Sequence, residues 1–176
     1  MSTLSFLGWL KLELERMSNV KTISIHKLAV LVQEENSRLA EPLLLFAMET
    51  GVVPRLMSFI NDREIKQEYQ EVLDVCGGKS ILDLDETGKE SLPWSYRKLL
   101  NNWRAAERKA QHIENSKRIR LERSLQLMKE KSVSNAQVYQ ALSLNPGNTN
   151  AYLKHHDISK LSLENSTKIM KYLYML

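Results

Sequence analysis

Apolar residues recur every three or four positions along most of this 176-residue chain, the spacing that places them on one face of an α-helix. The first such stripe is Leu4, Leu7, Leu10, Leu14 and Met17. The second is Ile25, Leu28, Ala29 and Val32. It follows Ser24, a residue type that often caps helices. Two helices are therefore expected in the first third of the chain.

Proline and glycine divide the next segment. We expect the chain to break near Ala40-Glu41 and to start a new helix with Pro42 in its first turn, because proline does not fit the interior of a helix. The run from Leu43 to Met48 is apolar on every side, which predicts a buried helix that stops at Thr50-Gly51. A further helical stretch is predicted from Pro54 to Val75. No segment alternates with period two over a useful length, so residues 1–76 are expected to form an all-helical domain.

Composition changes at residues 77–92, which begin with Gly77-Gly78 and carry several acidic residues. We place a linker there and a second region at 93–176. The next helix is expected to face inward with Trp94, Leu99, Leu100 and Trp103. A second basic helix is expected to face inward with Leu121, Leu125 and Met128 and mostly outward with Lys117, Arg118, Arg120, Arg123 and Lys129.

Two short helices around a tight turn are predicted after residue 133. Ser134 and Gln137 have the spacing of a capping box, which starts a helix at about Asn135. Asn145 suits the cap and Pro146 the first position of the second helix. Inward positions are Val138, Ala141 and Leu142 in the first helix and Thr149, Tyr152 and Leu153 in the second. Ser162 is expected to cap a third helix that carries Leu163, Ile169, Met170 and Leu173.

This pattern resembles the helix-turn-helix domain of the Cro and phage-repressor (lambda-repressor-like) type, including the Ser162-Leu163 opening of the last helix. The resemblance covers roughly residues 116–176. It departs from the family at Tyr139, where a small residue is usual, and at Ser143, where glycine is usual. The resemblance implies an all-α protein in which an N-terminal helical domain is joined through long basic helices to a C-terminal DNA-binding bundle. A three-helix core that binds no nucleic acid stays open as the alternative, because a generic helical hairpin also carries a capping box.

The resemblance also implies which residues meet DNA. In this family the second helix of the motif enters the major groove and the preceding helix points its N-terminus at phosphate. Carried over to this chain, the DNA-binding residues are Asn135, Gln137, Asn145, Gly147, Asn148, Asn150, Ala151, Lys154 and His155, with Pro146 beside them. Asparagine pairs bidentately with adenine, and lysine reaches guanine or phosphate. Asn135 is the expected phosphate contact, and Ser162 and Lys160 add another unless they only cap and solvate.

Charge is divided unevenly. Residues 1–92 hold 10 Lys+Arg against 15 Asp+Glu, a net of −5, whereas residues 93–176 hold 15 against 6, a net of +9. A cationic region beside the predicted motif favours a polyanionic partner. The single cysteine, Cys76, excludes an internal disulfide and fits a reducing cytoplasm. The longest apolar run is far shorter than the ~20 residues of a membrane span.

An enzyme is not expected, although one motif has the residue spacing of a phosphatase nucleophile loop. Asp83, Asp85 and Thr87 have the Asp-x-Asp-x-Thr spacing of haloacid-dehalogenase-type phosphatases, but that loop follows a buried strand and only Ile81-Leu82 precedes it here. His155 and His156 are adjacent and point about 100° apart on a helix, so they do not grip one metal. No cofactor is expected.

The sequence thus predicts a homodimeric, sequence-specific regulator of transcription that binds double-stranded DNA, as a repressor that includes its own gene among its targets. The alternative is a protein-interaction module, such as an antitoxin or phage-defence component, whose partner binds residues 1–92. A phosphatase that uses Asp83 and Asp85 ranks third.

Overall fold

The computed structural model describes residues 4–34 and 37–176, and these residues form helices and connecting loops without any strand. They divide into two compact units, one reaching to Glu107 and the other covering Arg108–Leu176. The all-α prediction is therefore confirmed for the described residues. Within this part of the chain, no helix is both long enough and apolar enough to cross a membrane.

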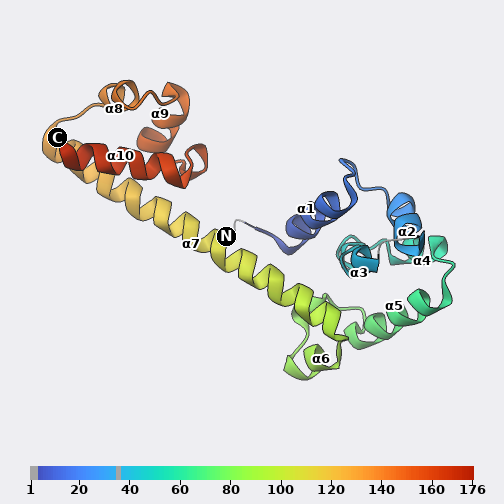
Figure 1. Ribbon diagram of the computed structural model, residues 1–176. Coiled ribbons are helices and arrows are strands. Elements are labelled where there is room, and N and C mark those ends of the chain that lie inside the picture. The colour runs from blue at the N-terminus through green and yellow to red at the C-terminus, as the bar shows by residue number, and fades with distance from the viewer. Residues whose placement is uncertain (1–3, 35–36) are drawn as a thin grey trace. The chain divides into compact units, whose positions relative to one another are not determined.

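The N-terminal unit is built from short helices with well-defined starts (Figure 1). They are α1 (Phe6–Ser18), α2 (Ile25–Glu34), the 3₁₀-helix η1 (Ser37–Leu39), α3 (Ala40–Glu49), α4 (Val53–Phe59), α5 (Arg63–Cys76), the 3₁₀-helix η2 (Ile81–Asp83) and α6 (Glu86–Ser91). Pro42 lies in the first turn of α3, as predicted. The stretch predicted from Pro54 to Val75 is two helices instead, because Ile60 is extended and the Asp62 side chain caps α5 by accepting a hydrogen bond from the Ile65 amide at 3.0 Å.

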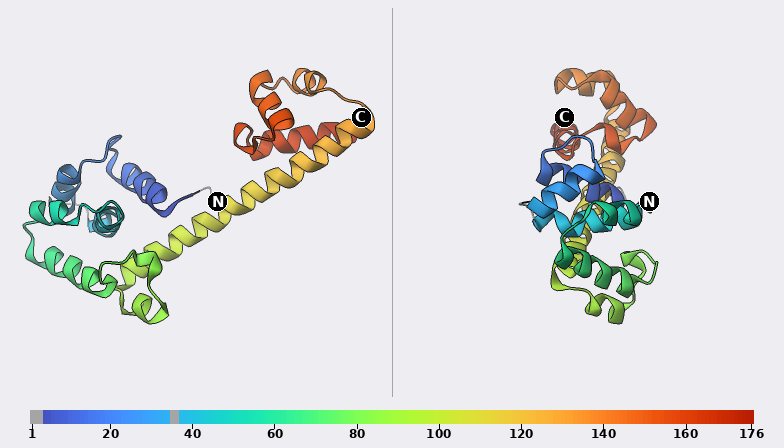
Figure 2. Two further views of the ribbon diagram at one scale, coloured as in Figure 1. Left: turned by 180° about the vertical axis from the view of Figure 1, so that it is seen from behind. Right: turned by 90° about the vertical axis from the view of Figure 1, so that its right-hand side faces the viewer.

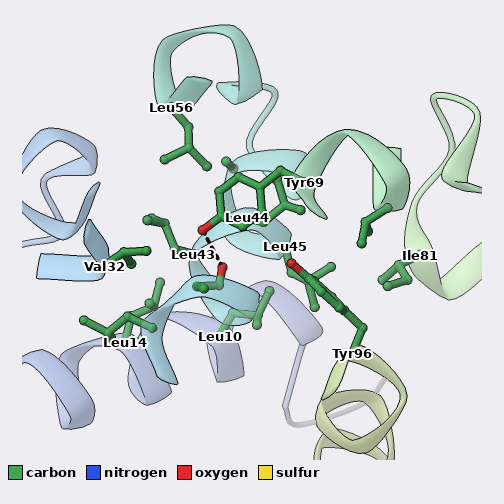
Figure 3. Close-up of a cluster of buried hydrophobic side chains, with 14 of the residues drawn as sticks. Leu10, Leu14, Val32, Leu43, Leu44, Leu45, Leu56, Tyr69, Ile81 and Tyr96 are labelled. Atoms are coloured by element: carbon green, nitrogen blue, oxygen red, sulfur yellow. Dashed lines mark hydrogen bonds between the residues drawn. The ribbon is translucent and has the colours of Figure 1, made fainter. Parts of the chain in front are cut away.

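The core of this unit surrounds α3, which packs against α1, α2 and α4. Leu43, Leu44 and Leu45 are fully buried, which explains why this helix is apolar on all sides. Figure 3 shows Tyr69 of α5 reaching α3, where its hydroxyl donates to the Ala40 carbonyl at 3.0 Å. Burial, together with nearby Glu41 and Glu68, raises the pKa of Tyr69 well above its usual value. The tyrosine thus stays neutral and ties α5 to the centre of the core.

Burial on α1 differs from the predicted stripe. Phe6 and Trp9 are buried beside Leu10 and Leu14, whereas Leu7 is 37% exposed. Phe6 also packs edge-on against Trp103, with ring centroids 5.1 Å apart. The aromatic side chains therefore take the inner positions, and the inward face is rotated away from Leu7.

Residues 77–92, expected to be a linker, pack into the N-terminal unit. Ile81 and Leu92 are buried in the same cluster as Tyr96 and Leu100 of α7 (Trp94–Lys131). Figure 3 shows Tyr96 beside Leu45 of α3 and Ile81 at the edge of the same cluster. The boundary between the two compact units therefore falls within α7, between residues 107 and 108, and not at the composition change. α7 is also one 38-residue helix where two basic helices were predicted.

The thiol of Cys76 lies at the end of α5 and is 2% exposed. Burial, with a smaller effect of Glu49, raises the pKa of this thiol. The cysteine is free and belongs to the core.

The C-terminal unit packs the end of α7 with α8 (Asn135–Ala141), α9 (Pro146–His155), the 3₁₀-helix η3 (Ile158–Lys160) and α10 (Leu163–Met175). Figures 1 and 2 show α10 alongside the C-terminal part of α7. The core of the C-terminal unit consists of Leu121, Leu127, Met128, Val138, Tyr152, Leu153, Leu161, Ile169 and Leu173. Ala141, predicted to face inward, is exposed, and Leu142 is half-buried. Val138 is therefore the fully buried anchor of α8.

Candidate nucleic-acid interface

The start of α8 is fixed by the predicted capping box. The Ser134 hydroxyl accepts a hydrogen bond from the Gln137 amide at 3.3 Å, and the Ser134 amide donates to Gln137 Oε1 at 2.7 Å. Two backbone donors at the helix start are thereby satisfied. Because Gln137 Oε1 is used in this cap, only the amide nitrogen of its side chain is left for another partner.

A tight turn connects α8 to α9. Ser143 has φ 52°, in the left-handed region that glycine adopts most readily, and the Leu144 amide donates to the Tyr139 carbonyl at 2.9 Å. Asn145 then caps α9, with its Oδ1 accepting from the Asn148 amide at 2.9 Å, and Pro146 occupies the first helical position. The turn thus sets the direction of α9 relative to α8 through backbone bonds.

The two sides of α9 are sharply different. Thr149, Tyr152 and Leu153 are buried, as predicted. The Tyr152 hydroxyl donates to the Lys117 carbonyl of α7 at 3.0 Å, and burial raises the pKa of Tyr152 to about 12. This inner stripe leaves the remaining positions on the outside: Pro146, Gly147, Asn148, Lys154 and His155 are exposed, and Asn150 and Ala151 are half-buried.

One hydrogen bond joins the two helices at this outer side. Asn135 Nδ2, on the first residue of α8, donates to Asn150 Oδ1, on the fifth residue of α9, at 3.2 Å. The bond holds Asn150 in one orientation and leaves its own amide hydrogens without a partner among the described residues. The sequence predicts separate DNA contacts for Asn135 and Asn150, whereas the structure brings the two side chains together. Fifteen positions separate the two residues, so helical spacing gave no signal of this contact.

The other predicted residues have distinct local roles. A Cβ at Gly147 would come 3.3 Å from Asn145 Oδ1, so glycine leaves room for the cap. Lys154 and His155 are in the last turn of α9, whereas His156 is its C-cap with φ 57°. Within the described residues no group of histidine, cysteine and acidic side chains is placed to hold a metal. Ser162 caps α10 by accepting from the Asn165 amide at 3.1 Å.

Positive charge dominates around the motif. Residues 108–176 hold 12 Lys+Arg against 5 Asp+Glu, a net of +7, and no acidic residue occurs from Lys131 to His156. Two of the five carboxylates are already in ion pairs, Glu114 with Arg118 and Glu164 with Lys168. A polyanion approaching α8 and α9 would therefore meet little local repulsion.

The two aspartates of the phosphatase-like motif lie at the ends of short helices. Asp83 ends η2, and Asp85 caps α6 by accepting a hydrogen bond from the Gly88 amide at 2.7 Å. The residues described around them form no strand. Asp85 is thus used in helix capping.

Comparisons with protein-family models, with curated proteins and with solved structures find no match to this chain.

Proposed function

We propose that this chain is a sequence-specific regulator that binds double-stranded DNA through α9 and acts as a repressor. The observation that carries the proposal is the burial of Thr149, Tyr152 and Leu153, which directs the amides and the lysine of a short, capped helix outward. A helix of this size fits the major groove of B-form DNA.

In this proposal some side chains contact bases and others contact phosphates. Asn148 is exposed, and its side chain is free to pair with a base because only its backbone amide serves the cap. Asn150 is held by Asn135 and offers its remaining amide hydrogens to an acceptor on a base or phosphate. The free backbone amides at the start of α8 and the charge of Lys154 would bind phosphate, which positions the helix without reading sequence.

Two copies are part of the same proposal. One α9 reaches one half-site, and regulators of this geometry bind two half-sites about one helical turn of DNA apart. Sedimentation analysis of the intact chain, alone and with selected duplex, would measure whether two copies assemble.

The test is selection from a library of random duplexes with the full chain, followed by affinity measurements on the selected duplex and on random DNA. Asn148→Ala should lose ~1–3 kcal/mol on the selected duplex and little on random DNA. Lys154→Ala should weaken both and reduce the salt slope by about one. If about six phosphates are contacted, affinity should fall by ~10³-fold between about 50 and 200 mM salt.

A matched control separates a local contact from overall charge. Lys168→Ala removes the same charge from α10, where Lys168 is paired with Glu164 at 2.7 Å, and should affect binding less than Lys154→Ala. Selection that yields no preferred duplex, or equal effects of the two lysine changes, would reject α9 as the reading helix.

A protein-interaction module is the second candidate function. It is favoured by an exposed tryptophan, Trp94, beside cations without ion pairs in the N-terminal unit. This surface has a different location from α9 and is independent of DNA binding.

A further inference from the structure

Five side chains form one outward stripe at the start of α7. Trp94, the adjacent pair Arg97 and Lys98, and the adjacent pair Asn101 and Asn102 follow one another at intervals of three or four residues, and all five are exposed. We call this set the Trp94 stripe. Trp94 is 66% exposed, although the sequence pattern predicted that it would face inward with Leu100 and Trp103. A tryptophan this accessible leaves much of a large apolar ring in solvent.

The surface along the stripe is hollowed. A hollow of about 380 Å³ is lined by the five side chains themselves. A neighbouring hollow of about 540 Å³ shares Trp94, Lys98 and Asn102 with it and is completed by side chains of α1 and α3 and by Arg38 of η1. A smaller one, about 150 Å³, shares Arg97 and Asn101 and extends to α6. An extended segment laid along the stripe would therefore have depressions for its side chains.

The cations of the stripe have no carboxylate partner. Lys98 Nζ lies 4.9 Å from the centroid of the Trp94 ring, and neither Lys98 nor Arg97 forms an ion pair with a described carboxylate. Of the other cations that line the neighbouring hollows, Arg16 and Lys89 are paired with Glu13 and Glu86. Arg38 and Arg104 form no ion pair with a described carboxylate. Unpaired cations around an exposed aromatic ring fit an occupant that carries both carboxylates and an apolar side chain.

The surrounding charges limit how long an anionic occupant would be. Glu13 and Glu41 line the 540 Å³ hollow together with Arg16 and Arg38. Glu86 and Glu90 line the 150 Å³ hollow together with Lys89 and Arg104. Residues 1–107 hold 13 Lys+Arg against 16 Asp+Glu, a net of −3. A nucleic-acid strand, with a charge at every nucleotide, would extend past Arg97 and Lys98 onto a unit of net negative charge. A short acidic peptide places its few charges on Arg97 and Lys98 alone.

We propose that the Trp94 stripe is a docking site for an acidic peptide segment of a partner protein. The segment sets an apolar or aromatic side chain against the Trp94 ring and carboxylates on Arg97 and Lys98. The site lies wholly in the N-terminal unit and does not depend on the function proposed for α9.

The test is selection of a phage-displayed random 12-residue peptide library on the intact chain, followed by binding measurements with the selected synthetic peptides. The expected peptides carry two or more Asp or Glu around an apolar residue. Trp94→Ala should weaken their binding by about 30-fold or more, as expected for an interface hot spot. Arg97→Gln with Lys98→Gln should weaken it comparably and remove most of its salt dependence. Since these side chains are exposed, the variants should keep the wild-type circular dichroism spectrum.

Arg108→Gln with Lys109→Gln is the matched control. It removes two exposed cations from the same helix beyond the three hollows and should leave peptide binding unchanged. Recovery of no peptides, of peptides without acidic enrichment, or of peptides that bind the Trp94→Ala chain as tightly as wild type would overturn the proposal. Binding of a 20-residue oligothymidine that Trp94→Ala abolishes would assign the stripe to nucleic acid instead. Affinity for the selected duplex, measured on the same variants, reports separately on α9.

Discussion

The left-handed backbone conformation of Ser143 can be tested by substituting glycine. With φ 52°, this serine lies in a conformation that costs L-residues roughly 1–2 kcal/mol. Glycine avoids that cost, and its greater freedom in the unfolded chain offsets part of the gain. Ser143→Gly should therefore stabilise the C-terminal unit by about 0.5 kcal/mol in urea denaturation. Ser116→Gly, in the middle of α7, should do the opposite by about 0.5 kcal/mol, because glycine is the poorer helix former. Destabilisation by Ser143→Gly would contradict the left-handed turn.

Glu68 should make the stability of the N-terminal unit depend on pH. Burial, with repulsion from Glu41 and then Glu71, raises the pKa of this half-buried carboxyl above its usual value. A raised pKa in the folded state means that the stabilising contribution is complete below the unfolded pKa and is lost as pH rises through the folded pKa. Glu68→Gln should accordingly raise the melting temperature at pH 7 and change it little at about pH 4. Glu90→Gln, an exposed carboxyl on α6, is the control, and an equal gain from it would remove Glu68 as the cause.

At the scale of elements, the cap of α8 tests how much one side chain contributes to the motif. Ser134→Ala removes the acceptor for the Gln137 amide and should destabilise the C-terminal unit by ~1 kcal/mol. Ser134→Thr keeps an acceptor and should recover most of that loss. Thermal melting of the wild type and the two variants measures these differences. A Ser134→Ala variant as stable as the wild type would show that solvent replaces the cap.

Local chemistry made several elements predictable from sequence. Ser134, Asn145 and Ser162 cap their helices where predicted, because a cap is decided by residues within one turn. Spacing alone did not identify the buried face where a helix has several apolar sides. On α1 the aromatic rings displaced Leu7, and on α7 Tyr96 took the inward position that Trp94 was expected to share. Likewise, the Asn135–Asn150 bond depends on how α8 and α9 pack, which no local pattern specifies.

For the whole molecule, the division into two compact units predicts separable unfolding. All three tryptophans, Trp9, Trp94 and Trp103, precede residue 108, so tryptophan fluorescence reports on the N-terminal unit, whereas circular dichroism reports on both. Leu173 is fully buried in the C-terminal core, and Leu173→Ala should cost ~2–5 kcal/mol there. This variant should lower the transition seen by circular dichroism and leave the fluorescence transition in place.

Leu44→Ala is the reciprocal variant, because Leu44 is fully buried in the N-terminal core. It should lower the fluorescence transition. If either variant moves both transitions equally, the two units unfold as one, and α7 transmits the loss of packing from one to the other.

The buried Cys76 thiol can report how often the core of the N-terminal unit is open. Cys76 is 2% exposed and the pKa of its thiol is raised, so a thiol-specific reagent should react with it when the surrounding core opens. When reclosing is faster than the reagent, the labelling rate divided by that of an unfolded thiol equals the fraction of time the unit spends open. Since the chain has one cysteine, each molecule takes up at most one label, and mass spectrometry can follow the labelled fraction under native conditions without denaturant.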